Sequence, residues 1–272
     1  MKKLLIIFIF LFIFSIGYTI DDKLNKSLLE SIAIVSDYSG EVLIKPNELE
    51  NFKNVELNMP VYEGDEIKTG PDSFIEITFD NASIIRIDDN SNLRVTELNR
   101  KNDTAKTILN LIFGKIIAIV EKLNQDSTFE VHTKMAIAAV KGTEFAVEGN
   151  ENETFAGVFD GKINFGSFNG NSIELEKEKE SKIDKNGKTA NPSNLTRMRK
   201  FEKILNRMRE EIKIIRELKN EGKEKVIQWR IKKKLEKEGK TVDESEEKIT
   251  LGGKDKEDTE KAEERIKGFL KK

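Results

Sequence analysis

The stretch VKGTEFAV at residues 140–147 decides how the middle of this chain folds. Its Lys141-Gly142-Thr143 run invites a phosphate-binding interpretation. A phosphate loop, however, needs a glycine-rich run that ends in Gly-Lys-Ser/Thr and opens a helix, so that backbone N–H groups face the anion. Here the order differs, and the following Phe145-Ala146-Val147 favours a strand over a helix start. We therefore interpret the stretch as a turn followed by a strand.

Short strand-like runs surround this stretch from residue 32 to residue 184. Turn residues separate them about every ten residues, a spacing typical of an all-β sandwich, barrel or solenoid and not of alternating strands and helices. SFIEITF at 73–79 alternates, which places Ile75, Ile77 and Phe79 on one face of a strand. KIIAIVE at 115–121 is apolar on both faces and predicts a strand buried on both sides. The sequence thus predicts an all-β domain over 32–184.

The pattern changes after Pro192. Ser193 or Asn194 is expected to cap a helix, because their side chains accept backbone N–H groups. Apolar residues then recur at +3 and +4 steps, as in a short coiled coil. We call this set the seam; it consists of Met198, Phe201, Leu205, Met208, Ile212 and Ile215. Asn220 and Gly222 interrupt it before a second helical piece. We predict basic amphipathic helices over 193–240 and a charged, largely disordered segment over 241–272.

Charge divides the chain as well. Residues 193–240 hold 17 Lys and Arg against 8 Asp and Glu, a net charge of +9, and 241–272 carry −2, so the whole-chain net of −2 leaves −9 for residues 1–192. The seam needs burial, against the β domain, a second copy or another protein. The basic face of the tail could be solvated, contact the acidic β domain, or meet an anionic wall polymer or lipid surface. It includes Arg197, Arg199, Lys200, Lys203, Arg207 and Arg209.

The N-terminus predicts export. MKKLLIIFIFLFIFSIGYTI at 1–20 has two lysines, an unbroken apolar run over 4–14 and then small residues, the pattern of a secretory signal. We predict cleavage after Gly17, a linker over 18–31, and a location in the periplasm or cell envelope; an uncleaved inner-membrane anchor is the alternative. Export makes nucleic acid a poor partner. The absence of Cys excludes disulfides, thiolate metal sites and a lipid-modified N-terminal Cys.

Few residues suggest chemistry. His132 is the only histidine, and a histidine-based site would want a second His or positioned carboxylates, so we expect it at a strand surface. DDNSN at 88–92 has the oxygen ligands that calcium prefers but lacks the Gly and terminal Glu of the twelve-residue calcium loop. It is explained as a solvated turn. Serine-nucleophile, dinucleotide and zinc motifs are absent from the sequence. We predict no enzyme, with no catalytic, cofactor-binding or metal-binding residues.

The β region resembles the FecR domain family. The segments that carry the resemblance follow one another in the family's order: AIVSDYSGEVLIK (33–45), VYEGDEIKTGPDSFIEITF (61–79), NASIIRIDDNSNLRV (81–95), LIFGKIIAIVE (111–121), FEVHTKMAIAAVKGTEFAVEG (129–149) and GVFDGKINFG (157–166). VKGTEFAV is similar to the family's Gly-Thr-x-Phe signature. The resemblance implies a compact all-β fold of two-strand units, a short solenoid or a sandwich. It also implies structural roles for Gly64, Asp65, Thr69, Gly70, Gly114, Gly142, Thr143, Phe145, Asp160 and Gly161.

Several of these positions carry local expectations. Gly142 should permit a tight backbone approach or a bulge, while Phe145 and Val147 point inward. Gly64-Asp65, Thr69-Gly70 and Asp160-Gly161 should form turns in which Gly supplies a positive φ. One departure from the family lies at 81–83, where Asn-Ala-Ser replaces the usual Asp-Gly-Ser. Because Ala resists a positive φ, we expect another turn type or a left-handed Asn81.

Full regulators of the family have a cytoplasmic segment that contacts a sigma factor, one membrane-crossing helix and a receptor-contacting domain. Only Met1-Lys2-Lys3 precede the apolar run here, so we do not carry that role over. We predict a non-enzymatic extracytoplasmic interaction module in envelope signalling or assembly, which binds an envelope protein, or itself through the helical tail. The alternative is a structural protein that binds cell wall or polysaccharide through its basic tail, from which high salt should release it.

Overall fold

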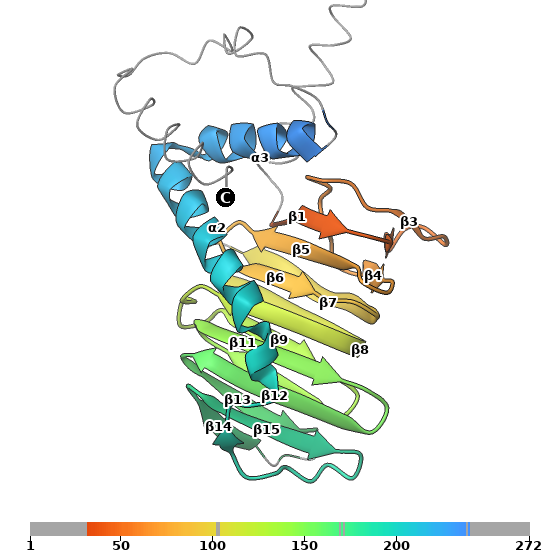
Figure 1. The fold of residues 1–272 in the computed structure, drawn as a ribbon, viewed down its shortest axis with the longest axis vertical. Helices are drawn as coiled ribbons and strands as arrows, with labels where there is room; N and C mark the ends of the chain where they lie inside the picture. The colour runs from red at the N-terminus through yellow and green to blue at the C-terminus, as the bar shows by residue number, and fades with distance from the viewer. Residues whose placement is uncertain (1–31, 102–103, 169, 171, 238, 240–272) are drawn as a thin grey trace, which may run out of the picture.

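The structure, a computed structural model, describes residues 32–101, 104–168, 170, 172–237 and 239. The predicted signal (1–17), linker (18–31) and charged segment (241–272) lie outside the described residues. Within them, strands form two sheets that share one long strand, β8 (Thr104–Val120). A helical tail packs along one of the sheets (Figure 1). The fold is therefore all-β with an α-helical tail, as the sequence predicts, and its two sheets face one another as a sandwich.

Both sheets run through β8. From one edge to the other, sheet A contains β1 (Ala33–Ser39), β5 (Phe74–Phe79), β6 (Ile84–Ile87), the second half of β8, β11 (Thr143–Gly149), β12 (Glu153–Asp160), β15 (Lys179–Asp184) and β16 (Ser193–Asn194). In the same way, sheet B contains β3 (Lys53–Asn54), β2 (Val42–Lys45), β4 (Glu66–Thr69), β7 (Ser91–Lys101), the first half of β8, β9 (Thr128–His132), β10 (Ala136–Val140), β13 (Lys162–Ser167) and β14 (Ser172–Glu176). These neighbours pair antiparallel, except that β8 and β9 run parallel.

Gly114 is the point at which β8 passes from sheet B to sheet A. The strand pairs with β7 and β9 before this residue and with β6 and β11 after it. Its φ is +106°, and a Cβ placed there would lie 2.2 Å from Ser91 Oγ and 2.5 Å from Ser91 Cα. Only glycine fits a backbone that both turns to positive φ and approaches a neighbour this closely.

The core lies between the two sheets and follows the alternation of the sequence. Ile75 and Ile77 point into it from β5, while Phe145 and Val147 point into it from β11. KIIAIVE is buried on both faces, as predicted. Ile116, Ala118 and Val120 face the core between the sheets, whereas Ile117 and Ile119 face the helical tail.

The exposed edge that β1 would present is covered by the segment 58–61. Asn58 N–H donates to Val35 O at 2.8 Å, Val35 N–H donates to Met59 O at 2.9 Å, and Val61 N–H donates to Ala33 O at 3.0 Å. An edge whose backbone groups are paired in this way cannot recruit a foreign strand.

The tail consists of η1 (Met198–Phe201), α2 (Glu202–Glu221) and α3 (Lys223–Lys237). Figure 1 shows α2 crossing the strands of sheet A diagonally and α3 lying across the β1 end. The expected cap at Ser193 or Asn194 is wrong, because these two residues form β16 and the helical turn begins only at Met198. A carboxylate from β15 takes over the capping role. Neither α2 nor α3 has the length and apolar content needed to cross a bilayer.

Candidate functional site

The family-signature glycines Gly64, Gly142 and Gly161 shape turns. Gly64, Gly142 and Gly161 have φ values of +90°, +88° and +82°. A Cβ on Gly142 would lie 3.0 Å from Lys122 Cα, so VKGTEFAV begins with the close backbone approach that the sequence suggested. Gly70 was expected to have a positive φ, but its φ lies outside that region. A Cβ built on Gly70 would lie 3.3 Å from the Cβ of Glu41, so the space there is limited.

The polar signature residues each tie down a turn. Asp65 accepts backbone N–H groups from Asn47 and Tyr62 at 3.1 and 2.9 Å, and burial raises its pKa. Thr69 donates its hydroxyl to the carbonyl of Asp88 at 2.6 Å.

The other two polar signature residues lie in the neighbourhood of VKGTEFAV. Thr143 donates to the carbonyl of Lys162 at 2.7 Å, and Asp160 pairs with Lys177 at 2.8 Å. Each of these two side chains thus makes a contact within the β domain.

The turn at 81–83 corrects the expectation that Ala would avoid a positive φ. Ala82 has φ +72°; its N–H donates to Phe79 O at 3.0 Å, and Phe79 N–H donates to Ser83 O at 2.8 Å. This is a turn closed by one left-handed residue, the place where hairpins usually have Gly. Asn81 supports it by accepting Ser83 N–H at 3.0 Å. Ala82 is buried against the tail, so the methyl group contributes packing that Gly would not.

The two weak candidates for chemistry sit in structural settings. His132 Nε2 lies 2.6 Å from a carboxylate oxygen of Glu130, and its ring meets the edge of Phe168. In the 88–92 turn, Asp88 pairs with Arg86 at 3.0 Å and Asp89 with Lys115 at 2.6 Å. The hydrogen bond from Lys115 lowers the pKa of Asp89. These cations occupy the carboxylates that a calcium ion would need.

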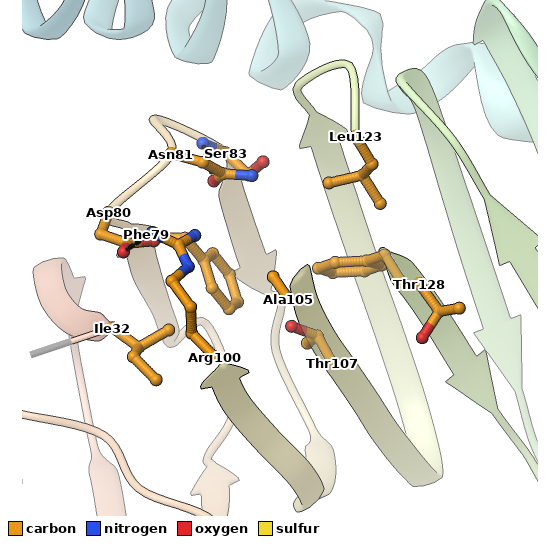
Figure 2. A pocket seen from close by; sticks show the side chains of 11 residues that line it. Ile32, Phe79, Asp80, Asn81, Ser83, Arg100, Ala105, Thr107, Leu123 and Thr128 are labelled. Atoms are coloured by element: carbon orange, nitrogen blue, oxygen red, sulfur yellow. Dashed lines mark hydrogen bonds and ion pairs between the residues drawn. The ribbon is translucent and has the colours of Figure 1, made fainter. Parts of the chain in front are cut away.

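Figure 2 shows a hollow near one end of the sandwich. Residues of the 80–83 turn and of the neighbouring ends of β7 and β8 line it. It offers about 10 Å3 to a water-sized sphere, about the lower limit for holding one water. Phe79 and Phe129 wall it, and Asp80 pairs with Arg100 at its side. Within the described part of the chain, no group of three or more His, Cys, Asp or Glu side chains is arranged to hold a metal.

The seam docks on the chain's own β domain. All six of its residues are at most 3% exposed and pack against the outer face of sheet A, where they meet Ile84, Ile117, Ile119, Ala146 and Phe159. The seam therefore packs on a sheet in cis and not on a second helix as in a coiled coil. A second copy or another protein would have to use a different surface of the tail.

Gly157 allows this docking to be close. A Cβ on this β12 residue would lie 2.7 Å from Leu195 Cδ1 and 2.7 Å from Met198 Cβ. The backbone of sheet A and the start of the tail thus approach one another at a point where only a hydrogen fits. Gly157 belongs to the family-like segment GVFDG. The sequence of this segment does not indicate which part of the chain packs against Gly157.

Ion pairs between the tail and the acidic β domain surround the seam. Arg197 and Lys200 both pair with Glu148, at 2.8 and 2.9 Å. Burial alone would raise the pKa of Glu148, but the two cations have the larger effect and lower it. Three further tail arginines pair with the domain: Arg199 with Glu178, Arg207 with Asp37 and Glu76, and Arg209 with Glu144. Lys203 is exposed and makes no ion pair among the described residues. The sequence left three alternatives for the basic face: solvent, the acidic β domain, or an anionic polymer or lipid surface. Five of its six named residues contact the acidic β domain.

Glu180 of β15 caps the start of the tail. Its carboxylate accepts the N–H groups of Thr196, Arg197 and Met198 at 3.0, 3.1 and 3.0 Å. Burial would raise the pKa of Glu180, but these hydrogen bonds outweigh it and lower the pKa. A carboxylate on the free N–H groups of a helix start is favourable because it meets both unpaired donors and the positive end of the helix dipole.

A buried charged group lies under α2. Glu76 is fully buried on the outer face of β5 and faces Arg86 at 3.4 Å and the guanidinium of Arg207. Burial and the nearby Glu211 raise the pKa of Glu76 to about 7, against the opposing effect of both arginines. Arg230 of α3 is also largely buried, which lowers its pKa to about 10. Alternation in SFIEITF places Glu76 on the outer face of its strand, opposite to Ile75 and Ile77. Its burial, however, comes from the tail, which is distant in sequence.

The outer face of sheet B is not covered by the tail. Register places Asn110, His132 and Ile137 side by side on it, and Ile112 continues the same face of β8. Phe168 lies against His132. Ile112, Phe113 and Phe168 are among the most exposed large apolar side chains, at 43%, 45% and 56%. We call Ile112, His132, Ile137 and Phe168 the sheet B patch.

Comparisons with known proteins give one family match and similar solved structures. Residues 65–164 match the family described as FecR protein, so the chain carries a FecR domain over that region. Two crystal structures of a "putative anti-sigma factor" from Parabacteroides distasonis ATCC 8503 are similar, at 16% identity with TM-scores of 0.42 and 0.41. The similarity covers 49% of this chain and 61% of theirs, so the chain spans about three fifths of their length. No curated protein matches the chain significantly.

Proposed function

We propose that the protein is an exported, non-enzymatic FecR-like interaction module that holds an envelope protein through the outer face of sheet B. The observation that supports this most directly is the asymmetry of the two sheets. Within the described part of the chain, the seam occupies the outer face of sheet A, whereas no helix packs on the outer face of sheet B, which carries the sheet B patch. Exposed apolar side chains grouped on one surface are a recurrent feature of protein-binding sites.

The alternative, a wall- or polysaccharide-binding protein anchored by its basic tail, is less well supported by the charges. Five of the six named cations are engaged by carboxylates of the β domain, which leaves fewer of them for an anionic polymer. Lys203 remains on the exposed side of α2 and offers a direct test of this alternative.

The two functions are distinguished by crosslinked capture from intact cells with the full-length chain, followed by mass spectrometry. The patch variant carries Ile112→Asp and Phe168→Asp, and the matched tail variant carries Lys203→Glu. The interaction module predicts that one envelope protein is captured, is lost with the patch variant, is retained with the tail variant, and binds the purified chain. Salt-sensitive recovery of wall material that depends on Lys203, with no effect of the patch variant, would favour the alternative and reject the proposal.

A further inference from the structure

Three of the four strands that end the two sheets have edges that the chain itself covers or that are very short. The backbone of β1 pairs with the segment 58–61. β15 is covered by β16 and by the residues before it, where Ala190 N–H donates to Lys182 O at 2.9 Å and Asp184 N–H donates to Lys188 O at 3.2 Å. β2 is covered by β3, and both β3 and β16 have only two residues. Edges of this kind give an incoming strand little to pair with.

The fourth end strand, β14, differs from the other three. It lies at one end of the sandwich (Figure 1), pairs with β13 on one side and has five residues. Among the described residues, no backbone group is hydrogen-bonded to its other side. The N–H and C=O groups of alternate residues point to the same side of a strand, so a row of them stays open along β14. Such a row can take up an extended peptide as a further strand.

The side chains of β14 alternate between the two faces of sheet B. Leu175 is fully buried in the core, and Ile173 packs against the core while partly buried. Ser172, Glu174 and Glu176 lie on the outer face and are exposed. An added strand has to continue this alternation, because a slip by one residue would move its apolar side chains to the wrong face. It therefore needs apolar residues on the core side and polar residues beside the two glutamates.

The two glutamates determine which charge the added strand should carry. Glu174 pairs with Lys162 of β13 at 2.8 Å but keeps 55% of its side chain exposed, and Glu176 has no ion pair among the described residues. Two copies of β14 paired antiparallel along their full length would place Glu174 opposite Glu174, and like charges directly opposite are unfavourable. Lys or Arg on a neighbouring strand would instead be attracted. The same two side chains thus disfavour self-association and favour a basic partner strand.

We propose that the open edge of β14 binds an extended segment of a partner protein in which apolar and basic residues alternate, and that this segment becomes the next strand of sheet B. Main-chain hydrogen bonds hold the segment, and the two glutamates select its charge. The site uses a different part of sheet B from the sheet B patch, and it does not rest on the function proposed for that patch.

A synthetic peptide tests the site directly. The probe is Lys-Val-Lys-Val-Lys-Val-Lys with blocked ends and a fluorescent label, titrated with the full-length protein in about 0.15 M salt and followed by fluorescence anisotropy. We expect saturable binding, and no binding of the same peptide with Glu in place of Lys. Two further peptides carry N-methyl groups on the Lys or on the Val backbone nitrogens. One of them should lose binding and the other should keep it, because only one set of N–H groups faces β14.

Charge reversal in the protein is the reciprocal test. Glu174→Lys combined with Glu176→Lys should weaken binding of the Lys peptide by about tenfold and allow the Glu peptide to bind. The matched control is Glu48→Lys combined with Glu50→Lys, which makes the same charge change at the same spacing in the exposed loop between β2 and β3. This control should bind as the wild type does, and so should the patch variant, which separates this site from the sheet B patch. Far-UV circular dichroism verifies that each variant is folded.

Amide hydrogen exchange locates the peptide on the protein. Saturation with the Lys peptide should slow the exchange of the outward-facing alternate amides within 172–176 and leave the amides of β9 unchanged. Binding that survives in both N-methylated peptides, or that is equal in the charge-reversed β14 variant, would overturn the proposal, because charge attraction alone or another surface would then explain it. Absence of binding would overturn it as well. A dimer in light scattering with slow exchange of β14 before any peptide is added would assign the edge to a second copy and reject the basic partner.

Discussion

Gly114 shows how much of this fold depends on one residue. A side chain there would have to adopt φ +106° and would meet the backbone and side chain of Ser91. We predict that Gly114→Ala lowers the free energy of unfolding by about 2–4 kcal/mol, because left-handed strain of about 1–2 kcal/mol adds to an overpacking cost of similar size. Urea denaturation measures the difference.

Gly170→Ala is the control for Gly114, because Gly170 has a comparable φ of +95° but nothing within 4 Å of a built Cβ. It should lose only the stability that corresponds to the backbone strain, about 1–2 kcal/mol. Equal losses for the two variants would mean that the contact with Ser91 is relieved by a small shift and does not limit residue 114.

At the same scale, the sequence was informative about apolar residues and less so about exceptions. Alternation predicted the inward side chains of β5 because a strand has only two faces, and the resemblance to the family signature predicted those of β11. Ala82 was misjudged, since its positive φ is stabilised by Asn81 and by burial under α2. The burial of Glu76 has the same origin. Both depend on the tail, which joins the chain more than a hundred residues later.

At the scale of elements, the cap on the tail is supplied by a different strand. We predict that Glu180→Ala lowers the free energy of unfolding by about 1–2 kcal/mol, the usual contribution of a helix cap. The pKa of Glu180 is lowered, so its contribution is present above its ordinary value of 4.5 and is lost as pH falls below it. Denaturation at pH 7 and pH 3 measures this, and the difference between the two proteins should be smaller at pH 3.

A matched substitution for the cap is Glu174→Ala, which removes an exposed glutamate of β14 whose ion pair among the described residues is with Lys162. It should change the stability by less than about 0.5 kcal/mol at both pH values. If Glu180→Ala also changed the stability by less than about 0.5 kcal/mol, water would replace Glu180 as the hydrogen-bond partner of the N–H groups at the helix start. The capping geometry would then have no energetic consequence.

Gly157 tests the docking of the tail as an element. We predict that Gly157→Ala displaces the start of the tail from sheet A, because the new methyl group would lie 2.7 Å from side-chain atoms of Leu195 and Met198. Tryptic cleavage after Arg197 and Arg199 should become faster while the β domain stays folded. Gly149→Ala on β11, whose nearest contact is a methyl group of Thr133 at 3.3 Å, should leave cleavage unchanged; acceleration in both variants would assign the effect to the sheet.

The seam illustrates what periodicity can and cannot predict for an element. Steps of three and four residues are sufficient to identify the helix and its apolar face from the sequence alone. They leave open what covers that face, because a sheet, a second helix and a partner groove all require the same pattern. The small residues that receive the seam, Ala146 and Gly157, lie on strands whose sequences alone do not indicate an approaching helix.

At the scale of the whole molecule, the acidic β domain and the basic tail form one folded unit. The division of charge along the sequence, −9 before residue 193 and +9 over 193–240, becomes a set of contacts between the two parts. Apolar burial holds the tail in place, and the partly exposed ion pairs select its orientation more than they stabilise it. KIIAIVE, apolar on both faces, is the one stretch of the β region whose sequence already required a second layer.

This organisation predicts that the β domain will not remain monomeric without its tail. A chain that ends at Pro192 would expose the outer face of sheet A, including Ile117, Ile119 and Phe159, a contiguous apolar surface of the kind that drives association. We expect it to elute as oligomers or aggregates in size-exclusion chromatography with light scattering. The same truncation carrying Ile117→Thr, Ile119→Thr and Phe159→Thr should recover a monomer, because the surface alone is changed. A monomeric truncated chain with the apolar residues intact would show that the β domain is complete by itself and that the tail is an accessory layer.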